Sequence, residues 1–147
     1  MKNLPIGISD FKEIIEDDYY YVDKSLFIKD IIDNGAKVIL LPRPRRFGKT
    51  LNISMLQYFF ENSSEDNRYL FKNLKINNKA EQYLKHQGKY PVIFLTFKGI
   101  KDLNWTDCFE DVKDIISEEY ERHNYLLEDN ILTAKEKKIY QQIIDLT

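Results

Sequence analysis

The chain has 147 residues, of which 43% are hydrophobic and 31% charged, and its net charge is −2. This composition excludes a disordered polypeptide and predicts one folded domain, residues 1–147, that is large enough to bury a core. A net negative charge argues against a protein that binds nucleic acid over its whole surface, and the apolar runs are too short to span a membrane. Because no targeting segment is evident and the single cysteine cannot form an internal disulfide, we expect a cytoplasmic protein.

The first part of the chain predicts helices followed by an apolar strand. Residues 10–18 are compatible with a helical turn. A second helix follows Asp23, a candidate N-cap, and should stop at the pair Asn34-Gly35. Residues 36–41, AKVILL, form a continuous apolar run that is typical of a strand buried on both faces.

The middle of the chain begins with the basic loop LPRPRRFGKT, residues 41–50. Apolar side chains then recur at helical spacing, which predicts a helix with one buried face over residues 49–60. Residues 68–76 and 79–89 read as short helical pieces. The run YPVIFLTF, residues 90–97, is a second candidate for a buried strand.

The last part of the chain predicts two helices. The first covers residues 104–123, with Asn104 or Thr106 as its cap and an apolar stripe along one face. The second opens at Thr133, with Glu136 at the spacing of a capping box. The order strand, helix, strand, helix predicts an α/β layered fold with parallel strands.

The triplet Gly48-Lys49-Thr50 lies between a predicted strand and a predicted helix, which is the context of a phosphate-binding loop. Backbone N–H groups at the start of a helix lack internal partners and face an anion. Gly48 permits close approach, Lys49 would reach the β- and γ-phosphates, and the Thr50 hydroxyl would be a ligand of Mg²⁺. The first glycine of the standard pattern G-x-x-x-x-G-K-[ST] is replaced by Arg43.

The predicted ligands of this loop are ATP and Mg²⁺. Lys49 is the candidate catalytic residue and Thr50 the candidate metal ligand. The candidate nucleotide-binding residues are Arg45, Arg46, Phe47, Gly48, Lys49, Thr50 and Leu51.

Several separated stretches resemble one protein family. LPIGISDFKEIIEDDYYYVDKS, LPRPRRFGKT, LFKNLKI and YPVIFLTF, spread between Leu4 and Phe97, are similar to the N-terminal part of the predicted AAA-ATPase-like family of bacteria and archaea. The family is related to STAND-type and archaeal P-loop ATPases, and its loop resembles RPRRFGKS, so Arg43 matches a family trait. The resemblance implies a P-loop NTPase-like three-layer fold, of which this chain would be an incomplete N-terminal portion.

The resemblance also draws attention to residues before the loop. Asp23 and Lys24 match a family motif and would lie near the nucleotide base or hold the loop in place, although Asp23 is equally well explained as a helix cap. Tyrosines 19–21 would stack on adenine, or at least one of them would pack on the core.

Hydrolysis of a nucleotide needs an acidic residue at the end of another buried strand, and we find no such strand in this sequence. In the resembling family the acidic strand comes later, and members often carry a PD-(D/E)XK nuclease-like domain at the C-terminus. We therefore expect nucleotide binding, without efficient hydrolysis by residues 1–147 alone. An incomplete sheet would leave open edges, which favours a homodimer.

Two alternatives remain open at this level. The basic stretch Arg43–Lys49 would serve as a phosphate grip in a nucleic-acid-binding module, although the overall acidity disfavours this role. The chain would otherwise be a non-catalytic interaction or scaffold domain that keeps the fold without turnover.

Overall fold

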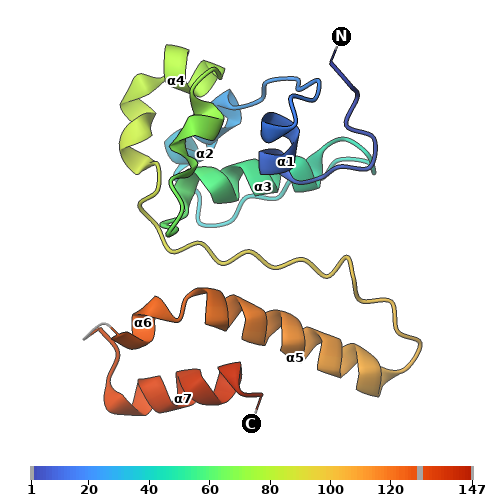
Figure 1. Cartoon of the computed structure of the whole chain (residues 1–147), viewed down its shortest axis with the longest axis vertical. Coiled ribbons are helices and arrows are strands. Elements are labelled where there is room, and N and C mark those ends of the chain that lie inside the picture. Colours follow the sequence, from blue (N-terminus) through green and yellow to red (C-terminus); the bar gives the residue numbers. More distant parts are fainter. Residues whose placement is uncertain (1, 129–130, 147) are drawn as a thin grey trace. The chain divides into compact units, whose positions relative to one another are not determined.

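The structure is a computed structural model that describes residues 2–128 and 131–146 (Figure 1). The chain forms two compact units, Met1–Val92 and Ile93–Thr147. The first unit contains, in chain order, α1 (Phe11–Glu16), α2 (Leu26–Asn34), α3 (Lys49–Phe60), the 3₁₀ helix η1 (Asn67–Phe71), α4 (Lys75–Lys79) and the 3₁₀ helix η2 (Glu81–His86). The second contains α5 (Trp105–Arg122), α6 (Tyr125–Glu128) and α7 (Ala134–Ile144). This division does not test the predicted single domain, which stays a prediction.

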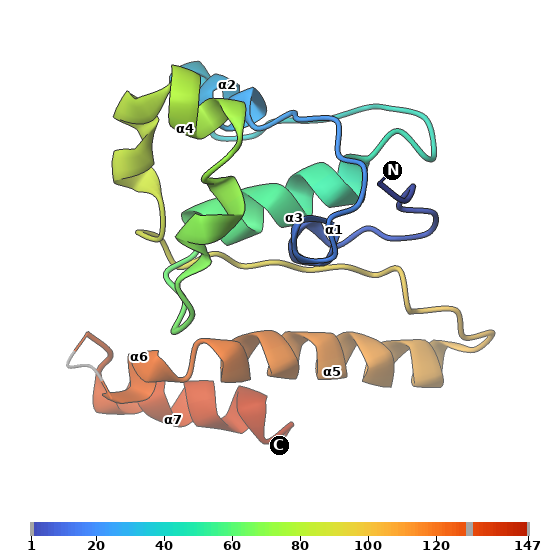
Figure 2. The same cartoon turned by 45° about the horizontal axis from the view of Figure 1, so that its top comes forward.

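The core of the first unit lies between α1, α2, α3, η1 and α4, and Figure 2 shows α1 against α3. One cluster of buried apolar side chains consists of Phe11, Ile28, Met55, Phe59, Leu70, Phe71, Leu74, Ile76 and Ala80. Aromatic rings connect the helices, because the Phe71 ring centroid lies 5.1 Å from that of Phe11 and 5.2 Å from that of Phe59. The helical spacing in residues 49–60 therefore predicted the buried face of α3 correctly.

Three of the helix ends carry the signals that the sequence predicts. Gly35 ends α2 in the left-handed conformation, with φ of 61°. The Asn104 side chain accepts a hydrogen bond from the Asp107 N–H at 2.9 Å and so caps α5. Thr133 and Glu136 form the predicted capping box at the start of α7.

The predicted α/β three-layer fold is wrong, because the residues that the structure describes contain no β-strand. Residues 36–41 and 90–97 follow an extended course without forming a β-ladder, and Figure 1 draws them as coil. Most of their apolar side chains are exposed and none is fully buried, with Val38 84% and Ile93 73% exposed. An apolar, β-branched run meets only the local requirement of a strand, whereas the ladder needs a partner that these residues do not supply.

Within the described ranges, Glu61 and Tyr90 form a parallel β-bridge. It follows α3 directly, since the Tyr90 N–H donates to the Phe60 carbonyl at 2.9 Å and the Asn62 N–H to the Tyr90 carbonyl at 2.8 Å. The homodimer expected from open sheet edges stays a prediction. Its premise is not met in the part of the chain that the structure describes, where no sheet edge is found.

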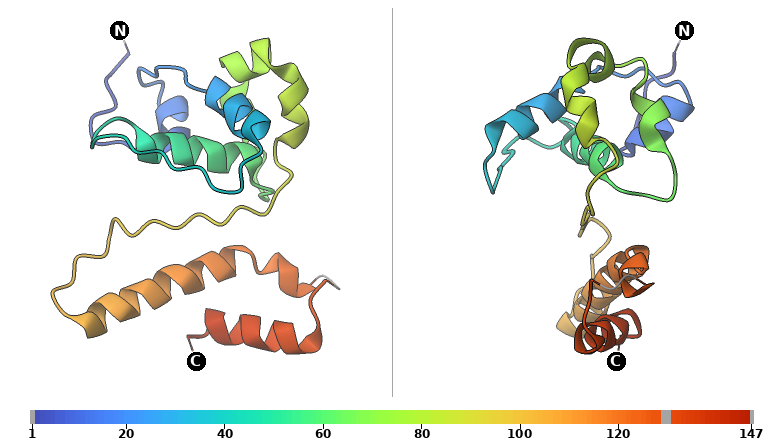
Figure 3. Two further views of the ribbon diagram at one scale, coloured as in Figure 1. Left: turned by 180° about the vertical axis from the view of Figure 1, so that it is seen from behind. Right: turned by 90° about the vertical axis from the view of Figure 1, so that its left-hand side faces the viewer.

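The second unit is a helical hairpin in which α5 and α7 lie side by side (Figure 3). The ring centroids of Tyr120 and Tyr140 are 4.7 Å apart, and the Tyr140 hydroxyl donates to the Tyr120 carbonyl at 2.8 Å. Trp105, at the start of α5, is 76% exposed. In the described residues, none of the helices combines the length and apolar character that crossing a membrane requires. The cytoplasmic location stays a prediction.

Candidate functional site

The helix α3 begins where the Gly-Lys-Thr triplet predicts it. Gly48 is the N-cap of α3 and is left-handed, with φ of 71° and ψ of 24°. Glycine adopts this conformation without steric cost. Because glycine has no side chain to accept hydrogen bonds, the first N–H groups of α3 are left to an external acceptor, and the positive end of the helix dipole lies there.

Lys49 folds back over the loop that precedes it. Its Nζ donates to the Arg43 carbonyl at 2.5 Å and to the Pro44 carbonyl at 2.9 Å. Arg46 is also left-handed, with φ of 68°. For a non-glycine residue this costs about 1–2 kcal/mol. The loop therefore holds a strained turn that brings the lysine amine over its own carbonyl groups.

The remaining predicted site residues divide between surface and core. Arg45, Phe47 and Thr50 are exposed, Phe47 at 56%. Leu51 is half-buried and packs against the core, so its side chain anchors α3. The segment before the loop is extended rather than a strand, so only the helical half of the expected strand–loop–helix arrangement is present.

A cavity of about 400 Å³ adjoins the loop. Its lining includes Tyr20, Tyr21 and Lys24 from the segment before α2, together with Arg46, Phe47 and Gly48 from the loop and Leu51 and Asn52 from α3. The Lys24 Nζ lies 3.8 Å from the point that a Cβ on Gly48 would occupy. The structure thus brings a second lysine close to the left-handed glycine, which the sequence suggested only as an open alternative.

The tyrosines predicted to stack on a base or to pack on the core are not equivalent. Tyr21 packs against the core, with its ring centroid 5.5 Å from that of Phe11 in an edge-on arrangement. Burial raises the pKa of the Tyr21 hydroxyl to about 12. The Tyr20 ring is 56% exposed at the cavity. At least one tyrosine therefore packs on the core as expected, and Tyr20 is the one that leaves a face free.

Asp23 has a structural role as an acceptor of backbone hydrogen bonds. Its carboxylate accepts the Ser25 N–H at 2.8 Å, and it accepts the N–H of Lys75, the first residue of α4, also at 2.8 Å. Ser25, rather than Asp23, is the N-cap of α2, so the predicted cap lies two residues further along the chain. Burial alone would raise the pKa of the Asp23 carboxyl, but the hydrogen bonds from Ser25 and Lys75 outweigh it and lower that pKa from 3.8.

A carboxyl group with a lowered pKa makes folding stability depend on pH. The contribution of Asp23 is complete above its ordinary pKa and is lost as the pH falls through the lower pKa of the folded state. As the pH is lowered from about 5 to about 2, we therefore expect the free energy of unfolding to fall less in Asp23→Asn than in the parent. Urea unfolding followed by circular dichroism measures this, with the exposed Asp30→Asn as control. Equal pH dependence in parent and Asp23→Asn would refute the assignment.

Asp10 is a positioning residue to which the sequence alone assigned no role. One oxygen accepts the Glu13 N–H at 2.9 Å and caps α1. The other accepts the hydroxyl of Ser54 at 3.2 Å and that of Tyr58 at 3.1 Å, both on α3. The Ser54 Oγ in turn accepts the Phe11 N–H at 3.0 Å. The stretch IGISDF was the feature of the sequence that could have drawn attention to Asp10. Its partners on α3, Ser54 and Tyr58, lie more than forty residues further along the chain.

Comparison with known proteins agrees with the resemblance seen in the motifs. The family described as Predicted AAA-ATPase matches residues 5–147. A protein named "Uncharacterized protein in vnfD 5′region", from Azotobacter chroococcum mcd 1, is 40% identical over 99 residues, or 67% of this chain. The chain spans only 17% of that relative's length. No solved structure matches.

Membership of a family of predicted ATPases suggests use of a nucleotide and Mg²⁺ in general terms. The match extends over nearly all of the sequence, and it includes the basic loop and both compact units. The chain therefore belongs to the predicted AAA-ATPase family.

Proposed function

We propose that residues 45–51 bind the phosphates of ATP, with Mg²⁺ as counter-ion. The observation that carries this proposal is the start of α3 at Lys49, directly behind a left-handed glycine that has no side chain to cap the helix. N–H groups in that position are donors for anionic oxygens, and the helix dipole adds to the attraction.

The side chains around this helix start fit the same ligand. Lys49 already donates to two backbone carbonyl oxygens of the loop itself, so its amine lies at the loop. We infer that the phosphates of ATP take the place of these carbonyl groups. Lys24, beside Gly48, adds a second positive charge. Arg45 and Arg46 are exposed and are expected to neutralise further phosphate charge.

The adjoining cavity is where we place the nucleoside. Its volume of about 400 Å³ falls within the range of small-molecule sites. The exposed ring of Tyr20 and the ring of Phe47 supply apolar surface at the cavity, which suits a flat base. This apolar surface suits either purine base, and ATP is the nucleotide that we propose.

The Thr50 hydroxyl is the donor that we assign to Mg²⁺. It lies on the first turn of α3, next to Lys49, and is exposed. A hydroxyl oxygen suits the hard Mg²⁺ ion, which takes its remaining ligands from phosphate oxygens and water. When bound, Mg²⁺ would neutralise charge on the phosphates. The proposal concerns binding and assigns no acidic residue to hydrolysis.

The test is isothermal titration calorimetry of residues 1–147 with ATP in the presence of Mg²⁺. We expect Lys49→Ala to weaken binding about 10- to 100-fold, because a hydrogen bond to a charged group contributes about 1.5–3 kcal/mol. Lys135→Ala removes the same charge from an exposed position on α7 and should leave the affinity unchanged. If Lys49→Ala and Lys135→Ala bind ATP equally well, the proposal is wrong.

The nucleic-acid alternative rests on the exposure of Arg43, Arg45 and Arg46 on one short loop. It predicts binding of a DNA or RNA duplex that weakens steeply as salt increases. A gel shift at low and moderate salt separates it from ATP binding. If the parent folds and binds neither ligand, the remaining reading is an interaction domain.

A further inference from the structure

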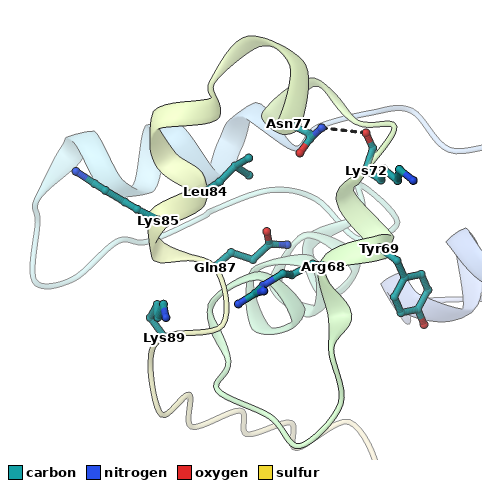
Figure 4. A pocket seen from close by; sticks show the side chains of 8 residues that line it. All are labelled: Arg68, Tyr69, Lys72, Asn77, Leu84, Lys85, Gln87 and Lys89. Atoms are coloured by element: carbon teal, nitrogen blue, oxygen red, sulfur yellow. Dashed lines mark hydrogen bonds between the residues drawn. The ribbon is translucent and has the colours of Figure 1, made fainter.

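A second cavity in the first unit, separate from the loop, has the chemistry of an anion site. It measures about 430 Å³, and Figure 4 shows the residues that line it. Four of them carry positive charge: Arg68 and Lys72 from the η1 region, and Lys85 and Lys89 from η2 and the segment after it. The described lining contains no carboxylate, so the positive charge is not balanced within the cavity.

Gln87 supplies a second, independent observation. It is only 7% exposed, and its Nε2 has no hydrogen-bond partner among the described protein atoms. Figure 4 shows the Gln87 side chain near the centre of the labelled residues. An unpaired buried amide donor is unfavourable, so this group would gain free energy from an acceptor that reaches it from outside the chain.

The backbone holds Gln87 firmly in place. Its N–H donates to the Leu84 carbonyl at 3.0 Å, and the N–H groups of the next two residues, Gly88 and Lys89, donate to carbonyl groups at the end of α3 at 2.9 and 3.0 Å. On the opposite side, the Asn77 side-chain amide donates to the Lys72 carbonyl at 3.2 Å, the dashed line in Figure 4. The backbone that carries Gln87 is therefore fixed, which lowers the entropic cost of ordering this side chain on a ligand.

Ion pairs with neighbouring carboxylates do not neutralise the positive charge of this cavity. The nearest described ion pair, between Arg68 Nε and an Asp66 carboxylate oxygen, spans 3.8 Å and is exposed. Such a pair contributes little. Arg68 thus keeps most of its donors for a ligand, and its planar guanidinium suits two oxygens of one phosphate group. The Leu84 side chain adds an apolar wall to the same cavity.

We propose that this cavity, which we call the Gln87 pocket, binds a small phosphate monoester, with Gln87 Nε2 and the Arg68 guanidinium as the donors to the phosphate. A dianion with several oxygens matches four cations and a buried amide donor better than a carboxylate does. The apolar wall and the volume leave room for an organic group beyond the phosphate. This site is independent of ATP binding at the loop.

The experiment follows the Gln87 side-chain amide signals by ¹⁵N–¹H NMR during titrations of residues 1–147. The protein carries Lys49→Ala, so that phosphate binding at the loop does not interfere. The probes are inorganic phosphate, phenyl phosphate and benzoate. We expect saturable shifts with both phosphates, tighter binding of phenyl phosphate because of its ring, and at least tenfold weaker binding of benzoate.

Two variants and a matched control complete the test. Arg68→Gln alters an exposed side chain, so the fold is retained, and it should weaken phenyl phosphate binding at least tenfold. Gln87→Leu, followed through the backbone amide of Lys89, should do the same. Lys79→Gln removes one charge from an exposed site outside the pocket and should change the affinity less than twofold. Equal effects of Arg68→Gln and Lys79→Gln, unchanged binding in Gln87→Leu, or the absence of saturable shifts would overturn the proposal.

Discussion

Phe59→Ala should destabilise the first unit by about 3–5 kcal/mol, the usual cost of removing a large aromatic side chain from a core. The Phe59 ring is fully buried, and it meets the rings of Phe60 and Phe71 edge-on at 5.1 and 5.2 Å. Truncation leaves a cavity between α3 and η1 and removes both ring contacts. Since small domains have only about 5–15 kcal/mol of stability, this change removes a large share of it.

The choice of probe matters for that measurement. The single tryptophan, Trp105, lies in the second unit, whereas Phe59 lies in the core of the first. Chemical unfolding should be followed by circular dichroism of the helices. Phe47→Ala is the control, because Phe47 is 56% exposed and its loss should cost less than about 0.5 kcal/mol. A loss below about 1 kcal/mol in Phe59→Ala would contradict the packing described here.

Asp10→Ala is expected to cost about 2–4 kcal/mol, which combines a lost helix cap with the loss of an acceptor for two hydroxyl groups. Ser54 is buried, and its hydroxyl would lose the carboxylate to which it donates. Tyr58 would lose its acceptor as well. Burial and the negative charge of Asp10 raise the pKa of the Tyr58 hydroxyl, so this group stays a donor throughout the neutral range.

The same substitution links the scaffold to the loop. Asp10 fixes α1 to α3, and α3 carries Lys49 at its first position. Asp10→Asn keeps an oxygen acceptor and should lose less than half as much stability as Asp10→Ala, as measured by chemical unfolding. Asp17→Ala removes an exposed carboxylate from the end of α1 and serves as control. If Asp10→Asn and Asp10→Ala are equally destabilised, the acceptor role is wrong.

The features that the sequence predicted correctly are local. A glycine after Asn34 ends α2, and Thr133 with Glu136 starts α7, because each signal acts within one helical turn. The start of α3 at Lys49 belongs to the same class. The two apolar runs failed as strands because a ladder depends on a second segment, and no property of 36–41 or 90–97 reveals whether one is present.

The site shows the same division. The start of α3 behind Gly48 could be predicted from the local sequence, and so could the position of Thr50 on the first turn of α3. The approach of Lys24 to Gly48 and the bonds from Asp10 to α3 join segments that are far apart in sequence. The Gln87 pocket likewise depends on how η1 and η2 fold toward each other, which side-chain periodicity does not encode.

The way in which Lys49 is held has a consequence for selectivity. The Lys49 amine already donates to two backbone carbonyl oxygens. An anion therefore binds to this lysine favourably only if its oxygens are better hydrogen-bond acceptors than those carbonyl groups. Chloride or a lone carboxylate gives little advantage in such an exchange, whereas a chain of linked phosphates offers many charged oxygens at once. If the loop binds ATP as proposed, weakly charged solutes would therefore compete poorly with it for this lysine.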